Sequence, residues 1–277
     1  MSSEDSADET LRAQIEALAR AGRVRGKTAV AQLEAEFRRR EEVLRQTFRR
    51  YVSPRVADKI LADSQLRDTL LSTADSRAHV VVVFADLRGF TAIAEQLEPN
   101  SIVPLLNEYF SLLTEITFRH DGTVFHMAGD CLMLAFGVPL EQPDSAQRAV
   151  WAAREMLGGF GELSRTWKQR YGIEAGLGIG INEGDVVAGN VGSAAYMSYT
   201  IIGDTVNVAA RLCQRARAGE MLFSRALKQS LDAHGVDVGA TPLPPLQLRG
   251  RSHPIDIYCV PLQTRMQLRT EPASAAL

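Results

Sequence analysis

Two aspartates in this sequence stand where they could hold a divalent cation beside a bound phosphate. Asp86 follows an apolar, mostly β-branched run at 80–84 that predicts a buried strand, and Asp130 precedes the mainly apolar segment 131–136. Carboxylate oxygens with open positions for water and phosphate suit Mg²⁺ or Mn²⁺. A pair of such ions can promote a phosphoryl displacement, because one activates the attacking oxygen while the other neutralises the leaving group.

Each aspartate also has an ordinary structural explanation. When either aspartate is considered alone, that explanation is better supported than metal binding. A strand followed by a polar turn and a helix is common in α/β proteins, and Asp130 after Gly129 is a usual hairpin-turn residue. A glycine turn at 88–91 directly follows Asp86. This turn favours phosphate binding near Asp86, because glycine lets backbone N–H groups approach a phosphate and a helix N-terminus favours the phosphate's negative charge.

A further polar group lies in the segment 199–211. Asn207 and Arg211 are four residues apart, so a helix there would place both on one face. An amide beside a guanidinium suits a sugar and an anionic phosphate, although an ordinary solvated helix face has the same composition. Asp204 is explained equally well as the start of that helix.

The elements that would position these residues alternate between strands and helices from about residue 78 to residue 262. A strand, a helical region, a hairpin across 128–130, a long helix and another strand follow one another in the order of a split βαβ unit. In that order the first strand and the hairpin are sheet neighbours, so Asp86 and Asp130 could share an ion. We therefore predict an α+β, ferredoxin-like domain with extra strands at one end. The predicted strands are 80–85, 123–127, 131–136, 173–182, 185–192, 198–202, 220–223, 245–249 and 254–260, and the predicted helices are 91–97, 101–119, 143–171, 203–216 and 224–233.

Residues 1–50 predict a helical region. Apolar side chains there recur every seven residues, as heptad a positions do, which favours a short coiled coil that pairs two chains over a single solvated helix. These residues are Val30, Phe37, Leu44 and Tyr51. The segment 21–28 fits a relaxed Walker A pattern, but it follows an amphipathic helix and not a buried strand, so we predict a loop there.

For residues 51–77 the sequence predicts a transducer helix and a linker. For residues 263–277 it predicts a flexible tail. The helix would begin at Ser53 and Pro54, an arrangement typical of a helix start, and would end at about Ala62.

Composition limits the functional classes. The chain has 277 residues, 45% of them hydrophobic, which suits one large domain with an appendage. Its net charge of −2 gives no reason to expect nucleic acid. Three scattered cysteines favour a reduced, cytoplasmic setting. No apolar run approaches the ~20 residues of a membrane span, and the N-terminus lacks a signal-peptide core, so we expect no membrane insertion.

Five segments together resemble the catalytic domain of class III nucleotidyl cyclases, in the order and spacing of that family, between about residues 78 and 260. They are FADLRGFT at 84–91, LNEYF at 106–110, GTVFHMAGD at 122–130, GIGINEGDVVAGNVGS at 178–193 and YTIIGDTVNVAAR at 199–211. Such a series is far more specific than any single motif. The sequence YVSP at 51–54, behind a charged helix, resembles the segment that joins signalling helices to bacterial cyclase domains.

The resemblance implies a head-to-tail homodimer with two sites at its interface, where the 3′-hydroxyl of a nucleoside triphosphate attacks its own α-phosphorus and expels pyrophosphate. One chain would hold two Mg²⁺ or Mn²⁺ ions, and the partner would supply Asn207 to orient the ribose and Arg211 to stabilise the transition state. The metal positions would be Asp86, Leu87 and Asp130. The turn residues Gly89, Phe90 and Thr91 and the basic Arg251 would bind the substrate.

The purine would be recognised by His126 and Thr200, which match the family's base-reading positions. Adenylate cyclases usually carry lysine at the first position and guanylate cyclases glutamate, whereas neutral histidine and threonine each donate and accept. The pair therefore suits either base. Threonine resembles a bacterial adenylate subgroup, so adenylate cyclase is the first hypothesis, and a protonated His126 would favour ATP as lysine does.

Three alternatives stay open. They are a guanylate cyclase, a catalytically weak nucleotide-binding signalling domain, and a diguanylate-type cyclase. The last would need a Gly-Gly-acidic turn where residues 128–130 are Ala-Gly-Asp.

Overall fold

The computed structural model describes residues 35, 36, 39, 53–63, 76–193, 196–248 and 253–261. Its contacts divide the chain into two units, Met1–Arg50 and Tyr51–Leu277, and the following concerns the second. Apart from residues 35, 36 and 39, the predicted coiled coil lies outside the described residues, as do most of the linker and the 263–277 tail. None of the helices in the described ranges has the length and apolar character that a bilayer crossing requires.

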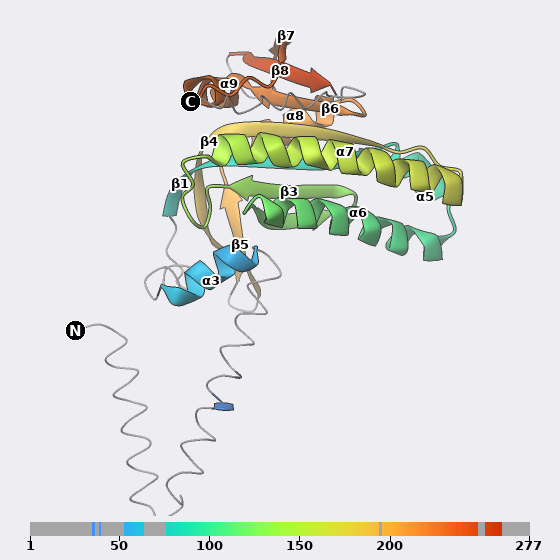
Figure 1. The fold of residues 1–277 in the computed structure, drawn as a ribbon, viewed down its shortest axis with the longest axis horizontal. Coiled ribbons are helices and arrows are strands. Elements are labelled where there is room, and N and C mark those ends of the chain that lie inside the picture. Colours follow the sequence, from blue (N-terminus) through green and yellow to red (C-terminus); the bar gives the residue numbers. More distant parts are fainter. Residues whose placement is uncertain are drawn as a thin grey trace, which may run out of the picture. The chain divides into compact units, whose positions relative to one another are not determined.

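The described part of the second unit contains one eight-stranded sheet, in the order β2-β3-β1-β4-β6-β8-β7 with β5 paired to β4 (Figure 1). The first four strands in that order form the split βαβ unit, so the predicted α+β, ferredoxin-like fold is confirmed. The strands are β1 (Ser76–Arg88), β2 (Thr123–Ala128), β3 (Cys131–Phe136), β4 (Gly176–Ser193), β5 (Tyr196–Ile202), β6 (Glu220–Ser224), β7 (Thr241–Leu246) and β8 (Ile255–Pro261).

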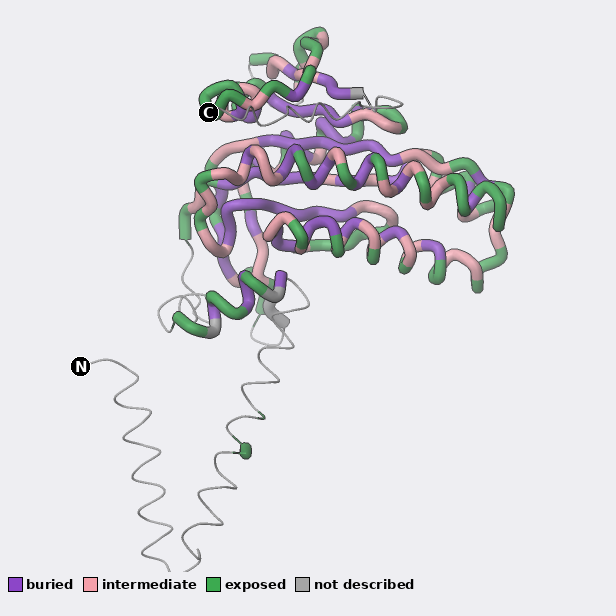
Figure 2. Tube along the Cα trace, in the orientation of Figure 1, coloured by how far each residue is buried: buried purple, intermediate pink, exposed green. Residues whose placement is uncertain are grey.

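Helices pack on both faces of the sheet, and β1 shows which side chains go to which face. Val81 and Val83 enter the large core with α6 and α7, whereas Val80 and Val82 pack on the opposite face with Ala209 of α8. Figure 2 shows the buried strands beside these half-exposed helices. Alternation places Asp86 on the α8 face. The helices are α3 (Pro54–Ala62), α5 (Phe90–Gln96), α6 (Pro99–Arg119), α7 (Ser145–Tyr171), α8 (Asp204–Arg215) and α9 (Arg225–Ala233).

Strand β4 corrects the prediction of two strands, 173–182 and 185–192, joined by a turn at 182–184. It runs unbroken through the turn-like Asn182-Glu183-Gly184, because β1 pairs with it from Ser76 opposite Ala188 to Arg88 opposite Gly176. The polar side chains find partners: Asn182 donates to the Thr205 carbonyl at 3.0 Å. Tertiary pairing has overridden local turn preference here. The predicted strand 245–249 is likewise displaced, to β7 at Thr241–Leu246.

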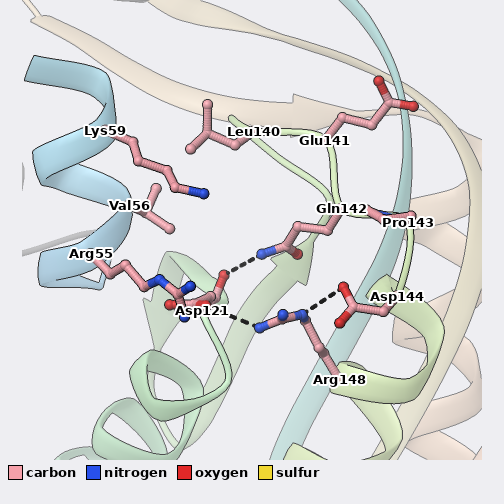
Figure 3. Close-up of a pocket in the computed structure, with 10 residues that line it drawn as sticks. All are labelled: Arg55, Val56, Lys59, Asp121, Leu140, Glu141, Gln142, Pro143, Asp144 and Arg148. Atoms are coloured by element: carbon pink, nitrogen blue, oxygen red, sulfur yellow. Dashed lines mark hydrogen bonds and ion pairs between the residues drawn. The ribbon is translucent and has the colours of Figure 1, made fainter. Parts of the chain in front are cut away.

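Helix α3 begins as predicted, with Ser53 as N-cap and Pro54 at the first position, and it ends at Ala62. The Ser53 hydroxyl accepts from Val56 N–H at 3.2 Å and donates to Asp121 Oδ1 at 3.2 Å. Arg148 of α7 reaches the same carboxylate at 3.0 Å, beside a cavity of about 380 Å³ between α3 and the loop before α7 (Figure 3). Asp121 therefore joins α3 to the domain just ahead of β2.

His79 supplies a pH-dependent link between β1 and β4. Its ring nitrogens lie 2.7 Å from Asp185 Oδ1 and 3.3 Å from Glu183 Oε1, and Glu183 is almost fully buried. The hydrogen bond to Asp185 is the main cause that raises the pKa of His79, against a smaller lowering by burial. A raised histidine pKa means that the folded state binds the proton more tightly than the unfolded chain.

We therefore expect His79→Gln to destabilise the protein in a pH-dependent way. The contribution of His79 is fully present below its ordinary value of 6.5 and is lost as pH rises through the higher folded value. Because the pair is partly exposed, the effect should stay below about 1 kcal/mol. Thermal melting of the wild type and of His79→Gln, below pH 6.5 and in mild alkali, measures this loss of stability. A stability difference between the two proteins that grows with pH would contradict the role given to His79.

Candidate active site

The structure brings Asp86 and Asp130 together where β1 passes the β2–β3 hairpin turn. Asp86 pairs in register with Cys131 of β3, and Asp130 is the residue just before Cys131 in the hairpin turn. Burial and then the charge of Asp86 raise the pKa of Asp130. The two carboxylates are thus close enough to repel, which is the situation a shared cation relieves.

Arg88 is a neighbour of this pair that the sequence analysis did not single out. It lies two residues after Asp86 in β1, on the same face of the strand, and its Nη1 donates to Asp86 Oδ2. Its Nε donates to the Ala216 carbonyl at 2.9 Å, and its Nη2 to the Cys213 carbonyl. The period-2 geometry of a strand was the signal that could have identified it.

A row of glycines on β4 makes this close packing possible. A Cβ at Gly178 would stand 2.5 Å from Arg88 Nε, and one at Gly180 would stand 2.0 Å from the backbone nitrogen of Cys213 in α8. No side chain larger than hydrogen fits at either place without a shift. The glycines therefore let α8 and the Arg88 guanidinium lie directly on the sheet backbone.

Asn207 and Arg211 share the exposed face of α8, as their spacing predicted. The opposite face of the helix is buried through Val208, Leu212 and neighbouring residues. Arg211 Nη1 donates to Gln214 Oε1 at 2.9 Å. Among the described residues, no hydrogen bond or ion pair joins Asn207 or Arg211 to either aspartate of the same chain. Both side chains are exposed to solvent on the surface of the chain.

The two base-reading candidates lie on strands that meet through an aromatic pair. Phe125 of β2 and Tyr199 of β5 stack with ring centroids 6.0 Å apart, and His126 and Thr200 are the residues that follow them. His126 is exposed and Thr200 half-buried. The stacked rings pack β2 against β5, so these two segments meet although they are far apart in sequence.

The remaining predicted positions differ in what the structure shows of them. Gly89 adopts φ +85° as the N-cap of α5, a conformation that favours glycine, and its carbonyl accepts from Ile93 N–H at 3.0 Å. Phe90 packs partly against the core and Thr91 is exposed. The Leu87 side chain is buried, so only its backbone could meet a metal. Arg251 lies outside the described residues.

The donor set fits a hard divalent cation. Two partly buried carboxylates repel one another, and oxygen ligands suit Mg²⁺ or Mn²⁺. Burial is the main cause that raises the pKa of the neighbouring Cys131 thiol to about 12, and Mg²⁺ and Mn²⁺ prefer oxygen ligands to sulfur. Within the described ranges no cluster of three or more His, Cys, Asp or Glu could hold a metal.

Comparisons with known proteins agree on one family. The model described as adenylate and guanylate cyclase catalytic domain matches residues 73–261. An uncharacterized protein of Mycobacterium tuberculosis is 35% identical over 201 residues, 72% of this chain and 34% of that protein. Adenylate cyclase 1 of Rhizobium meliloti is 34% identical over 211 residues, 72% of this chain and 30% of that protein. The chain thus spans about a third of the length of these curated relatives.

Solved structures of an adenylyl cyclase and of a guanylyl cyclase are both similar to this chain. The adenylyl cyclase CyaB from P. aeruginosa matches with a TM-score of 0.65 and 31% identity, over 69% of this chain and 97% of that one. The guanylyl cyclase Cya2 matches with a TM-score of 0.62 and 32% identity, over 66% of this chain and 92% of that one.

Proposed function

This chain belongs to the family of adenylate and guanylate cyclase catalytic domains, and on that premise we propose that it converts ATP to 3′,5′-cyclic AMP and pyrophosphate. The 3′-hydroxyl of the nucleotide loses its proton and bonds to the α-phosphorus, and the bond from that phosphorus to the pyrophosphate oxygen breaks. The observation that carries the proposal is the juxtaposition of Asp86 and Asp130 beside the hairpin turn. Formation of cyclic GMP from GTP is the second candidate.

Asp86 and Asp130, with the backbone of Leu87, are the groups that would hold two Mg²⁺ or Mn²⁺ ions per site. Bound there, the ions would activate the 3′-hydroxyl and neutralise the triphosphate. Arg211 would stabilise the charge that develops on the reacting phosphate, and Asn207 would orient the ribose. The turn at 89–91 and Arg251 would contact the triphosphate.

We propose that Asn207 and Arg211 act on the site of a partner subunit in a head-to-tail homodimer. Their exposure, and the lack of contact with the aspartates among the described residues, support this division. Apolar side chains on β4 and β5 add to it: Val187 and Ile202 are cross-strand partners, yet 41% and 53% exposed. Burial of such a pair in a subunit interface would be favourable.

The choice of base would depend on His126 and Thr200, since both side chains can donate and accept hydrogen bonds. The similar proteins include an adenylate cyclase of Rhizobium meliloti, and the similar solved structures include an adenylyl cyclase and a guanylyl cyclase. Threonine at position 200 makes ATP our first choice. The cytoplasmic setting expected from the cysteines would suit either nucleotide.

Substitution of His126 should move this preference in opposite directions. His126→Lys can only donate and should raise the ratio of ATP to GTP turnover, whereas His126→Glu accepts and should lower it. We expect a change of about tenfold either way, the size of one or two discriminating hydrogen bonds. Initial rates with both nucleotides measure the ratio. Equal ratios in all three proteins would remove His126 from base recognition.

The function itself is tested by incubating purified protein with ATP or GTP and Mg²⁺ or Mn²⁺ and assaying the cyclic product. Asp86→Asn is the matched control, because it keeps the side-chain shape and removes the charge. Nucleotide binding without cyclic product under all four conditions would favour the catalytically weak signalling domain. Cyclic GMP as the main product would favour the guanylate cyclase.

A further inference from the structure

The guanidinium of Arg88 links Asp86 to the C-terminal end of α8. One nitrogen donates to Asp86, and the others donate to the carbonyls of Cys213 in the last turn of α8 and Ala216 at its C-cap. Both side chains of the ion pair are mostly buried, with 23% of Arg88 and 24% of Asp86 exposed. Arg88 is therefore a fixed part of the site and not a solvated surface charge.

Each of these contacts has a clear physical benefit. The last carbonyls of a helix lack intrahelical partners, and a cation there also opposes the helix dipole. The planar fork of arginine can satisfy two carbonyls and a carboxylate oxygen at once, which the single ammonium of lysine cannot. Arg88 thus offsets part of the repulsion between Asp86 and Asp130: burial and the charge of Asp86 raise the pKa of Asp130, and the charge of Arg88 acts in the opposite direction.

A divalent cation bound at Asp86 would lie close to the positive charge of the Arg88 guanidinium and be repelled by it. The guanidinium is held between the α8 carbonyls and the Gly178 backbone, where a Cβ would lie 2.5 Å from both Nε and Nη2. It has no room to move toward β4. A cation that takes Asp86 Oδ2 must therefore break the Arg88 contact, and one that binds Oδ1 still bears the repulsion of the guanidinium.

We propose that Arg88 is a positioning residue that serves as the built-in counter-ion of Asp86, and that a divalent metal ion competes with it for the Asp86 carboxylate. The inference rests on the proposed function only in taking Asp86 as a metal ligand. Arg88 also joins Asp86 of one site to α8, whose Asn207 and Arg211 would serve the other site.

The test is the Mn²⁺ affinity of the nucleotide-free full chain, measured by the electron paramagnetic resonance of free Mn²⁺. Arg88→Gln should bind Mn²⁺ about tenfold more tightly than the wild type, because it removes a positive charge at contact distance. Arg88→Lys keeps the charge and should stay near the wild-type affinity. Arg215→Gln, which removes an exposed cation from the same end of α8, should change it less than about twofold. Adding Asp86→Asn should abolish the tight binding.

Unchanged or weaker Mn²⁺ binding by Arg88→Gln would overturn the proposal, because a merely structural role lowers stability without raising metal affinity. Should that variant not fold, the wild-type chain labelled with ¹⁵N-arginine serves instead. Its Arg88 Nε resonance, assigned with Arg88→Lys, should shift on addition of Mg²⁺, and an unshifted resonance at saturating Mg²⁺ would overturn the proposal as well. Cyclic product from the wild type is assayed separately, so the two proposals can fail independently.

Discussion

A mixture of Asp86→Ala and Arg211→Ala chains is expected to form cyclic nucleotide, although each variant alone should lose about a hundredfold to a thousandfold in turnover. In a mixed dimer, one site receives Asp86 from the Arg211→Ala chain and Arg211 from the Asp86→Ala chain, and is complete. The other site carries both changes. Random pairing makes about half of the dimers mixed, so activity should return to about a quarter of the wild type.

The control for this experiment is a mixture of Asp86→Ala with Asp130→Ala. Both changes fall in the same half of the site, so every site in every dimer lacks a carboxylate and no activity should return. Coexpression with two different affinity tags isolates the mixed dimers. Absence of activity in purified Asp86→Ala/Arg211→Ala dimers would contradict the shared site.

Gly180→Ala should be the most damaging small substitution in the sheet. Its Cβ would stand 2.0 Å from the backbone nitrogen of Cys213 and 2.5 Å from the Ala209 carbonyl oxygen. Both atoms belong to the α8 backbone, which cannot yield as a flexible side chain does. Overpacking of this severity should cost about 3 kcal/mol of unfolding free energy. The displaced helix would misplace Asn207 and Arg211, so turnover should also fall, by about tenfold or more.

Gly158→Ala is the matched control for this prediction. Gly158 lies in α7, and a Cβ there meets nothing within 4 Å. Alanine is the better helix former, so the variant should gain about 0.5–1 kcal/mol and keep wild-type activity. Urea unfolding and the cyclase assay on both variants provide the comparison. Wild-type stability for Gly180→Ala would show that α8 does not lie on β4 as closely as described.

The sequence by itself determined features that depend on neighbours in the chain. The buried apolar strand within β1, the split βαβ order and the Ser53 N-cap of α3 all appear in the structure as predicted. The approach of Asp86 to Asp130 could also be predicted from the sequence, because the split βαβ order places the β2–β3 hairpin next to β1. Such features rest on side-chain periodicity and on capping, which act over a few residues.

Tertiary structure alone decided what depends on partners distant in the chain. Asn182-Glu183-Gly184 has the composition of a turn, yet pairing with β1 and the bond to Thr205 hold it in a strand. The place of Arg88 required Cys213 and Ala216, more than a hundred residues away. These contacts form only when α8 packs on the β4 backbone, and no local preference encodes that packing.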